Sequence, residues 1–188
     1  MSRCKKGVLV ILFTIIFQHQ NIALAQSPKL SNFNATNTRD HLLIYLTVEG
    51  AFTEKIEKAI LSGVLTTFSY VITLYKVSDM WFDQQIVDLK ITHTIRYNII
   101  KKEFIITRSS KKSDPIVTLS LNEARKRMCE IDSLKIVALT KLEKGRRYQI
   151  RAKAELSKLT LPFYLHYVLF FVSLWDFETG WHTLDFLY

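Results

Sequence analysis

Four histidines and one cysteine are the side chains of this sequence best suited to catalysis or metal binding. Behind a leader that ends at residue 25, they are His41, His93, His166, His182 and Cys129. Their spacing matches no metal-binding motif, since there is neither a His-x-x-x-His helix nor a cysteine pair. Asp79, Asp83 and Asp88 lie close together, but their spacing is not that of a calcium loop. The sequence therefore predicts no metal site and no cofactor.

His93 lies in the most regular alternation of the chain, residues 87–97, where every second residue is apolar. It falls on the apolar face with Ile91 and Ile95, so we expect a hydrogen-bonded core histidine rather than a ligand or a catalytic base. His166 lies inside an apolar run and is interpreted in the same way. A histidine–carboxylate hydrolase stays open as an alternative if the fold brings two histidines and a carboxylate into one open pocket.

Cys129 has no histidine nearby in the sequence, so we interpret it as a helix residue rather than a nucleophile. The five glycines are scattered, and the sequence contains neither a Gly-rich phosphate loop nor a Gly-x-Ser-x-Gly nucleophile elbow. These absences favour a binding protein over an enzyme.

A row of cations follows the segment 148–156. Its outward positions are Arg147, Gln149, Arg151, Lys153 and Glu155, and they alternate with Tyr148, Ile150, Ala152, Ala154 and Leu156. This alternation predicts an amphipathic strand. Its candidate basic interaction face, Arg147, Arg151 and Lys153, would attract an anionic partner or lipid head groups, whereas a solvated face that keeps the domain soluble is the alternative. Aromatic residues do not interleave with these cations, which argues against nucleic acid.

Strands would hold most of these residues in place. Alternating or β-branched runs predict them over 42–48, 64–77, 87–97, 103–108, 134–139, 148–156 and 181–188. Two short helices are also predicted. The first spans 53–62 behind the cap Thr53, and the second spans 121–132 behind the capping box that begins at Ser120.

Composition and element order together indicate one domain. The chain has 188 residues, is 48% hydrophobic and 23% charged, and contains too few glycines and prolines for a disordered protein. Strands joined by short polar connections, without a βαβ alternation, predict a mainly β, single-domain antiparallel β-sandwich over 41–188. Residues 26–40 are polar and rich in Ser, Asn and Thr, which predicts a flexible leader.

The first 25 residues have the three parts of an export signal. A cationic start with Arg3, Lys5 and Lys6 precedes an apolar run over 8–17, and small residues end the segment at Ala25. The apolar run is about half the length of a membrane-spanning helix, which needs about twenty residues. We expect export to the periplasm and a mature net charge of +6. The alternative is an inner-membrane protein anchored by an uncleaved leader.

The C-terminal third contains an uncharged apolar run over 163–175, apart from any charge on its histidine. It would form a buried central strand or a surface that docks on a membrane or a partner. Leu184, Phe186 and Tyr188 alternate up to an aromatic end, as in outer-membrane barrels. A small outer-membrane β-barrel is therefore a further alternative, although two helices and the unalternating run 163–175 argue against it.

Three blocks of the sequence resemble the domain of unknown function 4390 family of exported bacterial proteins. They are the run 49–63, which begins Glu49-Gly50-Ala51-Phe52-Thr53, then Trp81-Phe82-Asp83 followed by Thr92-His93-Thr94, and Leu142-Glu143-Lys144-Gly145 with Trp175-Asp176-Phe177. The resemblance covers residues 40–188. It implies an exported protein of Gram-negative bacteria and supplies no known activity, ligand or catalytic residue.

The sequence therefore favours a non-enzymatic periplasmic module that binds a protein or an anionic envelope partner. Peripheral contact with a membrane is part of this interpretation, and nucleic acid is not. The sequence does not predict the oligomeric state or the identity of the partner.

We predict that signal peptidase cleaves this chain after Ala25, because small residues at positions 23 and 25 fit its narrow pocket. Intact-mass spectrometry of the exported protein should show a chain that begins at Gln26. A full-length mass for the exported form would instead identify the leader as a membrane anchor.

Overall fold

The structure, a computed structural model, describes residues 27–188 apart from 79, 81, 111–113 and 161–176. The predicted leader at 1–25 and the apolar run 163–175 lie outside the described residues. The described part forms strands β1 (Lys29–Asn37), β2 (His41–Glu49), β3 (Leu65–Lys76), β4 (Gln84–Asn98), β5 (Glu103–Arg108), β6 (Ile116–Thr118), β7 (Glu130–Ala138), β8 (Arg147–Thr160) and β9 (His182–Leu187). It also forms helices α2 (Glu54–Leu61) and α3 (Leu121–Cys129) and the 3₁₀ turn η1 (Leu139–Lys141).

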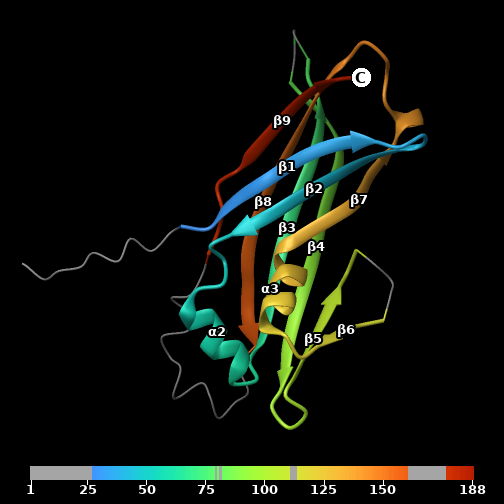
Figure 1. Ribbon diagram of the computed structural model, residues 1–188. Helices are drawn as coiled ribbons and strands as arrows, with labels where there is room; N and C mark the ends of the chain where they lie inside the picture. The colour runs from blue at the N-terminus through green and yellow to red at the C-terminus, as the bar shows by residue number, and fades with distance from the viewer. Residues whose placement is uncertain (1–26, 79, 81, 111–113, 161–176) are drawn as a thin grey trace, which may run out of the picture.

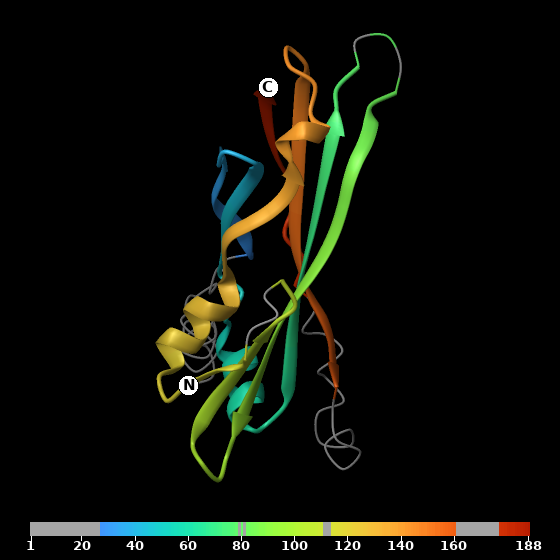
Figure 2. The ribbon, with the colours of Figure 1, turned by 90° about the vertical axis from the view of Figure 1, so that its right-hand side faces the viewer.

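The strands make two antiparallel sheets (Figure 1). The smaller sheet has the order β1-β2-β7, and the larger has the order β6-β5-β4-β3-β8-β9. Figure 2 shows the smaller sheet and both helices on the same side of the long, curved larger sheet. The predicted mainly β, single-domain antiparallel β-sandwich with two short helices is confirmed.

Strand β8 shows how alternation builds the core. Its inward side chains are buried, and they are Tyr148, Ile150, Ala152, Ala154 and Leu156. The neighbouring strand β3 pairs with β8 in register, so that Ile72 lies beside Ala152 and Tyr70 beside Ala154. The predicted amphipathic strand is therefore confirmed, with its cationic row on the face away from the core.

Local signals in the sequence place both helix starts correctly. Thr53 caps α2 by accepting the N–H of Ile56 on its hydroxyl at 3.4 Å, and Ser120 caps α3 in the same way through Glu123. Helix α2 ends before Gly63, whose φ of +84° suits the left-handed conformation that often follows a helix.

The second helix is shorter than predicted, since it ends at Cys129 rather than at residue 132. Met128 and Ile131 have a spacing of three residues, which fits one face of a helix, but Ile131 pairs with Leu46 of β2 as a strand residue. Both conformations would bury Ile131, so the apolar spacing did not distinguish between them.

The prediction of a flexible leader over 26–40 is wrong for residues 29–37, which form β1. This strand pairs with β2 along its length, from Lys29 opposite Glu49 to Asn37 opposite Leu42. Leu30 is buried and Phe33 packs against the core. Two apolar side chains are therefore enough to hold this polar segment as a strand when the edge of β2 is available for pairing. Pairing with a distant strand overrides local composition here.

The predicted hairpin within 87–108 is confirmed and leaves part of β4 exposed at its edge. Strand β4 pairs with β3 from Gln84 to Ile95 but with β5 only from His93 to Asn98. Asn98 closes the turn by accepting two main-chain N–H groups on its Oδ1 at 3.1 Å. The first half of β4 therefore has a strand neighbour on one side alone within the described residues.

We predict that Ile150→Ala lowers the free energy of unfolding by about 2–5 kcal/mol, because the side chain is fully buried and a cavity would remain. Arg151→Gln should change it by about 1 kcal/mol or less, because the residue is partly exposed on the outer face. Urea unfolding of the two variants checks this contrast. Equal losses would contradict the two-faced packing of β8.

Candidate functional site

His93 lies on the inner face of β4 and is 1% exposed. Its Nδ1 is 3.0 Å from the carbonyl oxygen of Met128, and its ring centroid is 4.9 Å from that of Tyr70. A carbonyl only accepts hydrogen bonds, so Nδ1 carries the proton and donates. The hydroxyl of Tyr70 donates to the same oxygen, and burial raises the pKa of Tyr70 well above its usual value. The predicted core histidine is confirmed.

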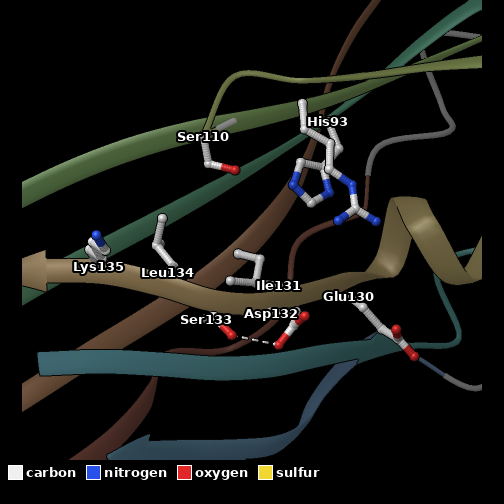
Figure 3. Close-up of a pocket in the computed structure, with 9 residues that line it drawn as sticks. His93, Ser110, Glu130, Ile131, Asp132, Ser133, Leu134 and Lys135 are labelled. Atoms are coloured by element: carbon white, nitrogen blue, oxygen red, sulfur yellow. Dashed lines mark hydrogen bonds between the residues drawn. The ribbon is translucent and has the colours of Figure 1, made fainter. Parts of the chain in front are cut away.

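Next to His93 a cavity of about 350 Å³ opens between β7 and the strands β4 and β5. It is lined by His93, Arg108, Ser110, Glu130, Ile131, Asp132, Ser133, Leu134 and Lys135. Figure 3 shows Ile131 and Leu134 on the side of β7 that faces His93, whereas Glu130 and Asp132 project from the opposite side. The carboxylates are therefore not directed at the histidine.

Arg108, the last residue of β5, lines this cavity together with a second cation, Lys135. Its Nη2 donates to the carbonyl of Arg127 at 2.5 Å, while its buried Nε makes no hydrogen bond within the described residues. Burial and the neighbouring Arg127 lower the pKa of Arg108. One nitrogen of the guanidinium thus binds the end of α3, and the side chain also lines the cavity.

Strand β7 is irregular where it borders the cavity. Its register with β2 shifts between the pairs Ile44–Leu134 and Leu46–Ile131, which places a bulge at Ser133. Ser133 has a φ of +57°, an uncommon conformation for a residue with a side chain, and its hydroxyl donates to Asp132 at 2.9 Å. Bulges and strained residues of this kind are frequent beside functional sites.

A second cavity, of about 450 Å³, continues along the same strand and shares Lys135 with the first. Its lining consists of His41, Ile86, Val87, Asp88, Lys135, Ile136, Val137, Ala138 and Lys141. The two cavities together form what we call the β4–β7 groove, bounded by residues 130–138 and 141 on one side and by 86–88, 93, 108 and 110 on the other, with His41 also in its lining. Cavities of this size are typical of binding sites.

The cations of the predicted basic interaction face lie on β8 as expected, but carboxylates accompany them. Arg151 is 3.5 Å from Asp83 and stacks on Tyr75, with 4.6 Å between the guanidinium carbon and the ring centroid. Lys153 pairs with Glu178 at 2.5 Å.

Arg147, the third cation of that face, is exposed at the start of β8, where its main chain pairs with Leu187. Charge on this face is thus largely balanced at Arg151 and Lys153. Whether the face binds a partner stays a prediction.

The described histidines lie on three different strands, β2, β4 and β9. His93 lines the first cavity, His41 lines the second, and His182 on β9 makes a contact of 3.2 Å from its Nδ1 to the carbonyl of Gly180. His166 lies outside the described residues. Within those residues no group of three His, Cys, Asp or Glu side chains could hold a metal ion.

Cys129 was predicted to be a helix residue, and it is the last residue of α3. Its side chain is buried. Burial raises the pKa of its thiol to about 12, so at neutral pH it is protonated and a poor nucleophile.

Sequence reasoning missed the groove. Arg108 is recognisable in the sequence only as the end of a hairpin strand, and Lys135 only as an outward residue of its strand. Ser133 gives no sign of its left-handed conformation, since serine is common in ordinary strands and turns. What brings these residues together is the placement of β7 beside β4 and β5.

These features define a class, a small β-sandwich-like protein in which three strands and two helices cover one side of a curved six-stranded sheet. The chain belongs to the DUF4390 family, a domain of unknown function, whose model matches residues 25–185. The resemblance seen in the three sequence blocks is therefore confirmed. No curated protein and no solved structure matches the chain. Among the helices that the structure describes, none has the length and apolar character needed to cross a bilayer.

We predict that His93→Leu folds and loses only about 1 kcal/mol of stability, because the Tyr70 hydroxyl continues to satisfy the Met128 carbonyl. Ile95→Asp, on the same buried face, should abolish folding because it buries an unpaired charge. Circular dichroism and urea unfolding of both variants test this. A well-folded His93→Leu protein that loses its cellular role entirely would instead assign chemistry to the imidazole.

Proposed function

We propose that this protein is exported to the periplasm, loses its leader after Ala25 and acts there as a non-enzymatic binding protein whose recognition surface is the β4–β7 groove. The tripartite leader supports export. The groove supports binding, because two adjoining cavities of about 350 and 450 Å³ run along one strand and combine apolar walls with a few charged side chains.

One observation carries the proposal. Every residue of β7, from Glu130 to Ala138, lines one of the two cavities. Side chains of a strand alternate between its faces, so an unbroken run of lining residues means that the main-chain edge itself borders the groove. An exposed main-chain edge is a surface for recognition and supplies no chemical group for catalysis.

The geometry favours binding over hydrolysis. A histidine base needs a free ring nitrogen directed at a substrate, together with a partner that orients it. His93 is buried and donates from Nδ1 to a main-chain carbonyl, and the nearby carboxylates of Glu130 and Asp132 project from the far side of β7. This arrangement suits a histidine that fastens two elements together.

The groove also suits a partner better than the cationic row of β8 does. Lys153 and Arg151 already pair with Glu178 and Asp83. Lys135 and Lys141 line the groove without an ion pair in the described part of the chain. A cation that makes no ion pair attracts an anionic partner more strongly.

Site-specific photo-crosslinking in living cells tests the proposal. A photoreactive amino acid replaces Lys135 or Lys141 in the groove, Arg151 or Lys153 on the outer face, or Lys101 in the β4–β5 turn as a control. We expect adducts in the periplasmic fraction from the two groove positions, in several-fold excess over Lys101. Adducts from Arg151 and Lys153 alone would move the binding surface to the predicted basic face. A lack of adducts at every position would contradict a binding role.

A further inference from the structure

The β4–β7 groove lies between two strand edges that have no strand partner in the described structure. Strand β7 pairs with β2 on one side, and among the described residues no strand pairs with its other edge. Strand β4 pairs with β5 only from His93 onward, so residues 84–91 are paired with β3 alone. Main-chain groups at such edges are a template for a further strand.

Hydrogen bonds of Thr92, next to the point where β4 begins to pair with β5, show in which direction the main-chain groups of β4 point. Thr92 donates its N–H to the hydroxyl of Ser109 at 2.8 Å and accepts the N–H of Ser109 on its carbonyl at 2.9 Å. In an antiparallel strand, alternate residues direct their main-chain groups to the same side. Lys90 and Asp88 therefore present N–H and C=O groups along the unpaired edge.

The same argument applies to the end of β7. Leu139 donates its N–H to the carbonyl of Asp40 at 2.8 Å, which directs residue 139 toward β2. The carbonyl of His41, opposite Ala138, is taken by the N–H of Thr38 on the other side of β2. The main-chain N–H of Ala138 thus faces the groove and not β2.

Side chains beside these edges indicate what the strand partner would carry. Ile136 and Val137 are buried, and Ile86 and Val87 are half-buried, which suits apolar residues at alternate positions of a bound segment. Lys135 and Lys141 make no ion pair within the described structure, and they outnumber Asp88, the carboxylate that lines the same second cavity. That cavity is therefore net positive, and complementary side chains are acidic.

The seam on the other side of the sandwich is a weaker candidate. A cavity of about 330 Å³ lies there between β1 and β9. Among its described lining residues the charged side chain is Asp185, which already accepts a hydrogen bond of 2.8 Å from Gln149. That seam offers no unpaired cation for a partner to recognise.

We propose that the protein binds an extended polypeptide segment, with acidic and apolar residues in alternation, which adds as a strand to the free edge of β7 within the β4–β7 groove. The inference deepens the proposed function and rests on the groove being the recognition surface. Main-chain hydrogen bonds provide affinity, and Lys135 and Lys141 select for acidic side chains.

Ala138 allows the main-chain contribution to be removed without altering the fold. Its φ of −71° and ψ of 135° match the φ of about −65° that proline imposes. Because the N–H of Ala138 faces the groove, Ala138→Pro removes a donor from the free edge and no hydrogen bond from the sheet. Ala138→Ser, which keeps the N–H, is the matched control.

The test measures binding of synthetic peptides to the purified exported protein by fluorescence anisotropy. The probe has about eight residues, the length of an ordinary strand, with valine and glutamate in alternation. Its controls have lysine in place of glutamate, or N-methyl groups on alternate residues that block one hydrogen-bonding edge. We expect the acidic peptide to bind and both controls to bind about tenfold more weakly or not at all.

Two variants separate the main-chain and charge contributions. Ala138→Pro should weaken the acidic peptide about tenfold while Ala138→Ser leaves its affinity unchanged. The double change Lys135→Glu with Lys141→Glu should favour the lysine peptide over the acidic one. A matched pair of reversals in the β4–β5 turn, Lys101→Glu with Lys102→Glu, should preserve the original preference.

Each other outcome overturns the inference in a recognisable way. Equal binding of the N-methylated peptide would exclude strand addition. Photo-crosslinks from Lys135 and Lys141 without binding of any peptide would leave the groove as the recognition surface but refute an extended peptide as its occupant. A dimer in analytical ultracentrifugation that Ala138→Pro dissociates would assign the edge to a second copy of this chain. If no crosslinks form from Lys135 or Lys141, the proposed function itself is refuted.

Discussion

The last carbonyl groups of α3 accept their hydrogen bonds from side chains of three strands of the large sheet. These hydrogen bonds fix the position of β7, which begins at the next residue. A helix leaves its last carbonyls without partners inside the helix, and a buried carbonyl without a hydrogen bond costs about 1–3 kcal/mol. Tyr70 of β3 and His93 of β4 both donate to the carbonyl of Met128, and Arg108 of β5 donates to that of Arg127. The helix end is therefore fastened to the large sheet at the residue where the chain turns into β7.

This fastening leaves the sandwich open on one side. Strand β7 begins close to β4, pairs with β2 and leaves its other edge along a groove. Proteins commonly blunt exposed edges with bulges and charged side chains, since a flat apolar edge invites aggregation. The bulge at Ser133 and the charge on Lys135 have that effect here.

The distribution of paired charges separates two surfaces that look alike in composition. The net charge of the whole chain is +9, and the cationic row of β8 is its most conspicuous feature in the sequence. In the folded chain Lys153 lies against Glu178 and Arg151 against Asp83, whereas Lys135 and Lys141 in the groove have no acidic partner among the described residues. Attraction for an anionic partner depends on such uncompensated charge and not on the number of cations in a row.

Much of the architecture could be predicted because it rests on interactions between near neighbours in the sequence. Two-residue alternation identified the inner face of β8 and placed His93 in the core, and capping by Thr53 and Ser120 marked where both helices begin. These signals are local, since a strand or a helix cap involves residues only a few positions apart.

The tertiary structure alone decided the features that depend on distant partners. Residues 29–37 became a strand because the edge of β2 was available, and Ile131 became a strand residue because it met Leu46. The groove exists because β7 lies beside β4, which no pattern within either segment encodes. The sequence by itself determined which residues face the core, because burial follows a local period. Which strand edges stay unpaired, and which cations lack a carboxylate, was decided by the pairing of segments far apart in the chain.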